Sequence, residues 1–140
     1  MAVQAPQLCD DLQCRLLLVE DNDAVAQATR QVLESMGCSV LRVDSGQAAL
    51  DSIHNDVAFD LVLSDIEMPG EIDGITLATA LTNRNPPLPV VLMTGYAVRL
   101  EQAVQRKLDV LPKPCTPEML GEAIARALAR NKALAGVAGS

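Results

Sequence analysis

The sequence predicts an α/β fold with an open, doubly wound, five-stranded parallel sheet and helices on both faces. Short apolar runs alternate along the chain with segments whose apolar residues recur at helical spacing. Several runs are apolar nearly throughout, as parallel strands buried on both faces are. The length of 140 residues fits one compact domain, and right-handed crossovers favour the open sheet.

Five mostly apolar runs, each closed by polar or turn-forming residues, predict the strands. The last run leads into Pro112 and Pro114, which would interrupt the hydrogen bonds of a central strand. We therefore expect this strand at an edge of the sheet. The predicted strands are residues 15–19, 38–43, 59–64, 89–93 and 108–111.

Helical patterns follow each of these strands. The first ends at Gly37, a usual C-terminal signal, and Ser45 can cap the second. Thr116 and Pro117 begin the last with a capping hydroxyl and a proline in the first turn. In chain order, the apolar stripes are Val25, Val32, Leu33 and Met36; Ala49, Leu50 and Ile53; Leu77, Ala78 and Leu81; Leu100, Ala103 and Val104; and Leu120, Ile124 and Leu128.

We expect one domain over residues 15–131, between a flexible N-terminal segment, 1–14, and a flexible C-terminal tail, 132–140. The formal net charge of −7 disfavours binding to nucleic acid or anionic membranes. One Phe, one Tyr and no Trp exclude a base-stacking platform. No segment predicts a membrane span or a secretion signal.

The four cysteines indicate a reducing, cytoplasmic environment. Cys9, Cys14, Cys38 and Cys115 are scattered without a paired spacing, which argues against a zinc site. Cys38 and Cys115 lie in apolar contexts, so we expect buried thiols there.

Polar side chains follow four of the predicted strands. Glu20 and Asp21 follow the first, Asp65 the third and Thr94 the fourth, while Lys113 follows the fifth. Ligands of such sheets bind beyond the carboxyl ends of the strands, where these residues would meet. Three converging carboxylates would repel one another unless a cation lay between them, and Mg²⁺ prefers oxygen ligands. Acids, a metal, a lysine and a hydroxyl together suit a phosphoryl group.

Each of these residues also has a simpler interpretation. The acids after the first strand could cap the following helix, through Asn22 or Asp23. Asp65 could be an ordinary loop acid, Thr94 part of a turn and Lys113 a solvated charge. One shared site explains all of these positions at once, so we prefer it.

Asp65 stands out because Leu61, Val62 and Leu63 precede it and Met68 and Pro69 follow. A carboxylate at the end of a buried strand, beside a metal, can attack phosphorus and form an acyl phosphate. We expect its neighbour Ser64 to face a helix layer and Glu67 to point to solvent near the site mouth.

The pattern resembles the receiver domain of two-component response regulators, over about residues 15–131. The resemblance rests on Leu18-Val19-Glu20-Asp21-Asn22, on Leu63-Ser64-Asp65-Ile66-Glu67-Met68-Pro69 with Asp73-Gly74, on Met93-Thr94-Gly95-Tyr96-Ala97 and on Lys113-Pro114. It implies a flavodoxin-like fold with strand order 2-1-3-4-5.

The resemblance also implies roles in Mg²⁺-dependent phosphoryl transfer from a phosphohistidine of a histidine kinase or phosphotransfer protein. It implies a cis bond between Lys113 and Pro114. The implied roles are Asp65 as phosphoacceptor and metal ligand, Asp21 as direct metal ligand, Glu20 as ligand directly or through water, the Glu67 backbone carbonyl as ligand, Lys113 as partner of a phosphoryl oxygen, and Thr94 as its hydrogen-bond donor.

Three features depart from the usual receiver pattern. Val110 stands where many receivers have the Tyr or Phe of the switch, so Tyr96 is the nearest aromatic that could replace it beside Thr94. The loop over residues 68–74 is one residue longer than usual, and the short interval from Thr94 to Lys113 predicts a truncated or poorly formed fourth helix. These features resemble receivers attached to hybrid sensor histidine kinases.

The leading hypothesis is therefore a signalling switch with no external substrate, which can lose its own phosphate. A phosphatase with an Asp nucleophile is a second candidate, in which Glu67 would be the general acid. A receiver used only as an interaction module is a third, favoured by Val110 and the short fourth helix. A homodimer through the fourth-helix face is possible.

Overall fold

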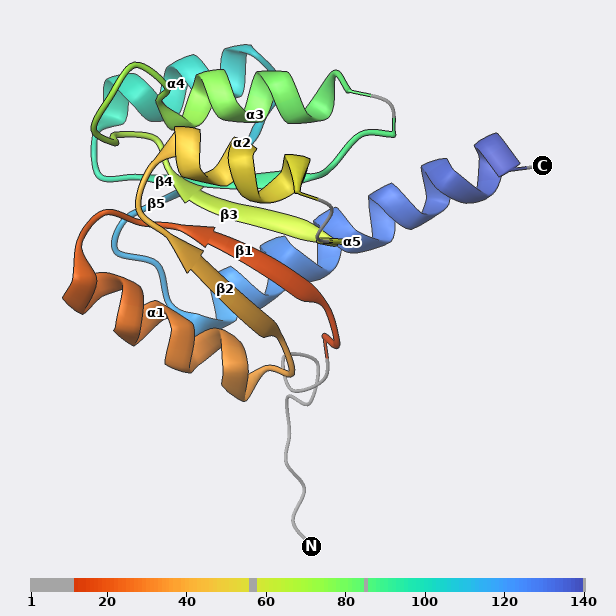
Figure 1. The fold of residues 1–140 in the computed structure, drawn as a ribbon, viewed down its shortest axis with the longest axis horizontal. Helices are drawn as coiled ribbons and strands as arrows, with labels where there is room; N and C mark the ends of the chain where they lie inside the picture. The colour runs from red at the N-terminus through yellow and green to blue at the C-terminus, as the bar shows by residue number, and fades with distance from the viewer. Residues whose placement is uncertain (1–11, 56–57, 85, 140) are drawn as a thin grey trace, which may run out of the picture.

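Five parallel strands form one sheet in the order β2-β1-β3-β4-β5, in a computed structural model that describes residues 12–55, 58–84 and 86–139. Helices alternate with the strands along the chain (Figure 1). The predicted fold class and strand order are confirmed. The elements are β1 (Arg15–Val19), α1 (Asp23–Ser35), β2 (Ser39–Val43), α2 (Gly46–His54), β3 (Leu61–Asp65), α3 (Gly74–Thr82), β4 (Val90–Thr94), α4 (Ala97–Gln105), β5 (Asp109–Pro112) and α5 (Pro117–Gly139).

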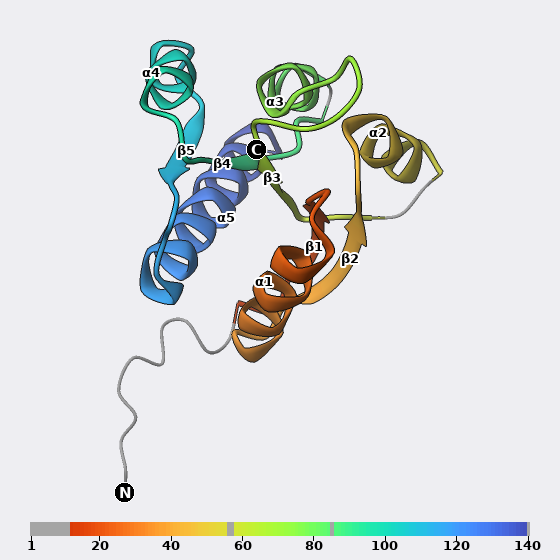
Figure 2. The same ribbon diagram turned by 90° about the vertical axis from the view of Figure 1, so that its left-hand side faces the viewer.

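The sheet lies between two helix layers, with α1 and α5 on one face and α2, α3 and α4 on the other (Figure 2). Successive side chains of β1 point to opposite faces. Leu16 packs in one core cluster with Leu33 of α1 and Ile124 of α5. Leu17 packs in the other cluster with Leu77 of α3. Because both faces are covered, the central strands carry runs of consecutive apolar residues rather than an alternating pattern.

The strand boundaries agree with the sequence prediction to within two residues, and β5 lies at an edge as predicted. The two ends of the predicted domain differ from the structure. Leu12 donates a backbone hydrogen bond to the Met36 carbonyl at 2.7 Å, and Cys14 is buried, so residues 12–14 pack with the domain. The rest of the predicted N-terminal segment, residues 1–11, lies outside the described residues.

Helix α5 is longer than the sequence prediction, which ended the domain at residue 131. The helix continues through most of the predicted tail to Gly139. Three alanines, one leucine and one lysine stand among residues 132–138, and these residue types have high helix propensity. Neither α5 nor another helix of the described part has the length and apolar composition needed to cross a membrane.

Helix α4 is regular, although the sequence predicted a truncated or poorly formed helix. It has nine residues, as many as α2 and α3. Ala103 anchors it in the core cluster that it shares with α3. The Tyr96 side chain makes no capping hydrogen bond at its start, so the helix depends on packing rather than on a cap.

The cysteines partly follow the prediction. Cys38 is buried as expected, but Cys115 is only half-buried. Cys14, for which no burial was predicted, is also buried, with its Sγ 3.4 Å from the Cys38 Sγ. The two residues are neighbours because they precede the paired strands β1 and β2. Cys9 lies outside the described residues.

Candidate functional site

The structure brings the predicted site residues to one edge of the sheet. Glu20 follows β1, Asp65 ends β3 and Thr94 ends β4, and their exposed fractions are 2%, 4% and 1%. Lys113 follows β5 and donates its backbone N–H to the Thr94 carbonyl at 2.8 Å. Asp21 is exposed beside Glu20. Parallel strands place their carboxyl ends together, so four distant parts of the sequence meet here.

Asn22 separates the acids of the site from helix α1. Its Oδ1 accepts a hydrogen bond from the Val25 N–H at 3.0 Å, which confirms it as the cap. Its own N–H donates to Glu20 Oε2 at 3.1 Å. The capping interpretation of this stretch thus applies to Asn22, while Glu20 is turned into the site. Arg42, which the sequence did not single out, donates from Nε to the Glu20 carbonyl at 2.8 Å.

A close backbone approach holds the end of β3. The Gly74 N–H donates to the Ile66 carbonyl at 2.8 Å. A Cβ at Gly74 would lie 2.3 Å from the Asp65 carbonyl oxygen, so the first turn of α3 needs glycine here. Ser64 is buried, and its hydroxyl donates to the same Asp65 carbonyl at 2.8 Å. These contacts fix the backbone that carries the Asp65 carboxylate.

Three carboxylates form the acidic cluster of the site. Oxygens of Glu20, Asp21 and Asp65 lie within 4.8 Å of one another. Glu20 Oε1 is buried and accepts no hydrogen bond from the described residues, and Asp65 Oδ1 is buried against the Lys113 ammonium. Burial, followed by the neighbouring Asp65 carboxyl, raises the pKa of Glu20 to about 7. The cluster therefore favours a bound proton or cation.

Lys113 supplies positive charge to the cluster. Its Nζ lies 2.6 Å from Asp65 Oδ1 and 3.8 Å from Glu20 Oε1, so it pairs closely with Asp65 and more loosely with Glu20. Burial alone would lower the pKa of Lys113, but the ion pair with Asp65 outweighs burial and the pKa is raised. The peptide bond from Lys113 to Pro114 is cis, as the resemblance implied.

The residues present fit Mg²⁺. The cluster offers only oxygen ligands, and Glu20 Oε1 is buried without a hydrogen bond from the described residues. One ammonium beside three carboxylates leaves the cluster net negative. A hard divalent cation would supply the missing charge, with water completing its coordination. The Glu67 carbonyl as a ligand stays a prediction.

Thr94 and Glu67 contact each other directly. The Thr94 hydroxyl donates to Glu67 Oε2 at 2.7 Å and accepts a hydrogen bond from the Tyr96 N–H at 3.1 Å. The Glu67 side chain therefore turns toward β4, and with 36% of it exposed it meets the expectation that it points to solvent only in part. Arg99 of α4 also approaches Glu67, with Nε 3.8 Å from Oε2. Sequence spacing gave no signal for Arg99, since its contact joins a helix to a distant loop.

The family model of the response regulator receiver domain matches residues 16–125. This chain belongs to the response regulator receiver family. It is a receiver domain of two-component signalling, and the predicted resemblance is confirmed.

Relatives of this receiver include response regulators and sensor kinases. The response regulator protein FleR of Pseudomonas aeruginosa is 38% identical over 118 residues, which are 82% of this chain and 24% of FleR. The sensor histidine kinase GacS of Pseudomonas protegens is 36% identical over 118 residues, which are 79% of this chain and 13% of GacS. The chain thus spans a minor part of the length of these relatives.

Solved structures show the same fold. A response regulator receiver domain protein from Clostridium thermocellum has a TM-score of 0.77 and 26% identity, over 86% of this chain and 98% of that chain. NtrX from Brucella abortus has a TM-score of 0.80 and 27% identity, over 91% of this chain and 29% of that chain.

Two residues with a predicted switch role flank α4 in the sequence of this receiver. Tyr96 precedes the helix, with 64% of its surface exposed. Val110 is half-buried on β5 and packs against the core cluster beneath α3 and α4. Val110 has no ring that could turn between buried and exposed positions. The switch role of both residues stays a prediction.

Proposed function

We propose that this receiver takes a phosphoryl group from a phosphohistidine onto Asp65, in a Mg²⁺-dependent reaction, and so changes its surface for signal output. The Asp65 carboxylate is the observation that carries the proposal. It is buried at the end of β3, 2.6 Å from the Lys113 ammonium and next to the two acids that follow β1. Strongly interacting charged groups of this kind gather at functional sites.

In the proposed step, an Asp65 carboxylate oxygen attacks phosphorus as the phosphorus–nitrogen bond of the donor breaks. The bonding electron pair leaves with the imidazole, and Asp65 becomes an acyl phosphate. Lys113 stays beside the attacking group and pairs with a phosphoryl oxygen. Mg²⁺, held by Asp21, Asp65, the Glu67 carbonyl and Glu20 directly or through water, would offset the charge of the incoming phosphoryl group.

The new phosphoryl oxygens would then draw Thr94 toward them. The Thr94 hydroxyl, which donates to Glu67 here, would donate to a phosphoryl oxygen instead. Its loop leads directly into α4, so the change would reach the surface of that helix. Tyr96 is the aromatic residue beside Thr94 that could report the change, in place of a ring at position 110.

The proposed partner is a histidine kinase or a histidine phosphotransfer protein. The relative GacS, a sensor histidine kinase, suggests that this receiver serves a hybrid kinase, which would itself be an enzyme. The receiver would be the switch of such a protein, with loss of its own phosphate as its own activity. The predicted domain over residues 15–131, together with residues 12–14 that pack on it, would act in the cytoplasm.

Phosphorylation by acetyl phosphate tests the proposal. The protein is incubated with acetyl phosphate and Mg²⁺, and intact-mass spectrometry measures the phosphorylated fraction. We expect one base-labile phosphoryl group on the parent, and none on Asp65→Asn or when the metal is chelated. The Asn side chain has nearly the same shape but lacks the nucleophilic carboxylate.

Other outcomes would support the competing hypotheses. Equal labelling of Asp65→Asn and the parent would show that Asp65 is not the phosphoacceptor. An interaction-only module would show no labelling and no dependence on metal. Release of many equivalents of phosphate from an unrelated phosphomonoester would indicate a phosphatase.

A further inference from the structure

A chain of polar contacts joins Thr94 to helix α4. Thr94 donates its hydroxyl to Glu67 Oε2 at 2.7 Å, and Arg99 Nε lies 3.8 Å from the same oxygen. Arg99 Nη2 also donates to Asp73 Oδ2 at 2.5 Å. We call these contacts of Arg99 with Glu67 and Asp73 the Arg99 bridge. The bridge links α4 to both ends of the loop between β3 and α3.

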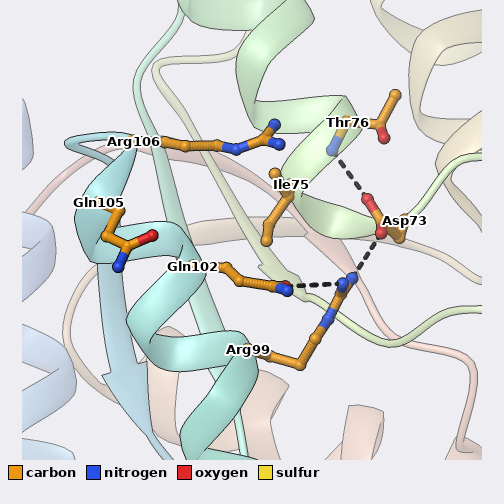
Figure 3. A pocket seen from close by; sticks show the side chains of 7 residues that line it. All are labelled: Asp73, Ile75, Thr76, Arg99, Gln102, Gln105 and Arg106. Carbon is orange, nitrogen blue, oxygen red and sulfur yellow. Dashed lines mark hydrogen bonds and ion pairs between the residues drawn. The ribbon is translucent and has the colours of Figure 1, made fainter.

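Asp73 is a firm anchor for this bridge. Its Oδ1 accepts the Thr76 N–H at 2.8 Å and caps α3, which leaves Oδ2 for Arg99 (Figure 3). Burial would raise the pKa of Asp73, but the capping N–H and the Arg99 guanidinium outweigh burial and lower it. The carboxylate therefore stays charged toward Arg99 at neutral pH.

The bridge lies at the edge of a pocket of about 420 Å³ between α3 and α4. Gln102 accepts a further hydrogen bond from Arg99 Nη1 at 3.0 Å, so the guanidinium is held within its own helix as well. Arg106 lines the same pocket, but Figure 3 draws no interaction from it to the other residues shown. Substitution of Arg106 is thus a matched control, because it removes one positive charge from the same pocket without breaking the Arg99 bridge.

The side chains of the bridge are partly shielded from water. The exposed fractions are 30% for Arg99, 36% for Glu67 and 34% for Asp73. Such pairs are worth little when fully exposed, and more when half-buried and networked. We therefore expect the bridge to shift the ratio of two conformations by a few-fold, without fixing the protein in one of them.

We propose that Arg99 is a positioning residue that holds the Glu67 carboxylate against the Thr94 hydroxyl and so favours the unphosphorylated arrangement. This inference rests on the proposed function of Asp65. Thr94 cannot donate its single proton to Glu67 and to a phosphoryl oxygen at once. Phosphorylation must therefore break the contact of Thr94 with Glu67, and the Arg99 bridge opposes that change.

The bridge also gives this receiver a connection from the site to α4 without an aromatic switch residue. Val110 has no ring to reorient, whereas Arg99 extends from α4 to Glu67, two residues after Asp65. When Thr94 leaves Glu67, the carboxylate loses one of its two partners. The Glu67 carboxylate then moves relative to Arg99, and this movement shifts the N-terminal half of α4.

The affinity for beryllium fluoride, a phosphoryl mimic, tests the inference. Calorimetric titration with excess Mg²⁺ gives the dissociation constant for the parent and for Arg99→Gln. We expect about three- to fivefold tighter binding to Arg99→Gln, because a half-buried ion-pair network of this kind contributes that much. Arg99→Lys, which keeps the charge, should restore part of the difference, and Arg106→Gln should bind as the parent does.

Two more variants separate positioning from a general structural effect. Asp73→Asn keeps a capping residue but removes the ion pair with Arg99, so it should tighten binding as Arg99→Gln does. In a Thr94→Ala background, Arg99→Gln should change nothing, because the bridge acts through Thr94. Unchanged or weaker binding to both Arg99→Gln and Asp73→Asn would overturn the inference. A parent that does not bind the mimic at all would instead overturn the proposed function.

Discussion

At the scale of single residues, the site is a balance of buried charges. Glu20 and Asp65 are nearly inaccessible to solvent, and Lys113 supplies one positive charge between them. Burial of an ionised carboxylate is unfavourable unless charge and hydrogen bonds compensate it. Without a compensating cation or proton such a site would hold electrostatic strain, and binding of either one would relieve it.

This strain predicts how stability depends on pH. Burial and then the Asp65 carboxyl raise the pKa of Glu20 from its ordinary value of 4.5 to about 7. Between these values the folded protein binds the proton more tightly than the unfolded chain does. The free energy of unfolding of the metal-free protein should therefore fall as pH rises from about 4.5 to 7, by up to about 3 kcal/mol.

Urea unfolding at several pH values, with chelator and with Mg²⁺, measures this dependence. Mg²⁺ should reduce the fall, because it stabilises the ionised form of the cluster. Glu20→Gln should also reduce it, because the titrating group is gone. If the metal-free parent and Glu20→Gln lose stability equally over this range, Glu20 does not carry the raised pKa.

At the scale of elements, the site depends on how closely α3 packs on the end of β3. Gly74 allows this approach, since its Cα faces the Asp65 and Ile66 backbone. Backbone atoms cannot move aside as a flexible side chain can. The first turn of α3 and the Asp65 carboxylate are therefore positioned by the same contact.

Gly74→Ala should destabilise the protein and impair phosphorylation. The added Cβ would lie 2.3 Å from the Asp65 carbonyl oxygen, so β3 or α3 must shift. We expect a loss of about 1–3 kcal/mol in the free energy of unfolding, as in overpacked cores, and slower labelling by acetyl phosphate. Denaturant unfolding and intact-mass labelling measure the two effects.

Gly95→Ala is the matched control for stability. The nearest atom to a Cβ there is Lys113 Cβ, 4.0 Å away, so the methyl group has room. We expect parent-like stability for this variant. Equal stability of Gly74→Ala and Gly95→Ala would show that the close approach at α3 is not a constraint.

At the scale of the whole molecule, one sheet connects two core clusters that lie on its opposite faces. Each central strand contributes side chains to both clusters. Disruption of one helix layer therefore also weakens the sheet that supports the other layer. This arrangement favours a single cooperative unfolding transition.

Ile124→Ala tests that cooperativity from the α5 face. Ile124 is fully buried, so its truncation should lower the free energy of unfolding by about 2–5 kcal/mol. Thermal unfolding followed by circular dichroism should show one transition at a lower temperature. Val98→Ala on α4, at a residue that is 67% exposed, should leave the unfolding temperature unchanged. Two separate transitions for Ile124→Ala would contradict the coupling of the two faces.

The alternation of elements, the strand positions and the edge place of β5 could all be predicted from the sequence. These properties depend on local patterns of apolar residues and on proline, which act within a few positions. The meeting of Glu20, Asp65, Thr94 and Lys113 at one edge also followed, because parallel strands end at the same side. The length of α5 was missed, since alanine-rich ends favour a helix without a clear apolar stripe.

The sequence by itself thus determined the fold class, the family and which residues gather at the site. Only the tertiary structure decided how those residues face one another. The pairing of Lys113 with Asp65, the turn of Glu67 toward Thr94 and the reach of Arg99 to Asp73 are examples. Each depends on side-chain directions from elements far apart in the chain, and periodicity along one element contains no information about them.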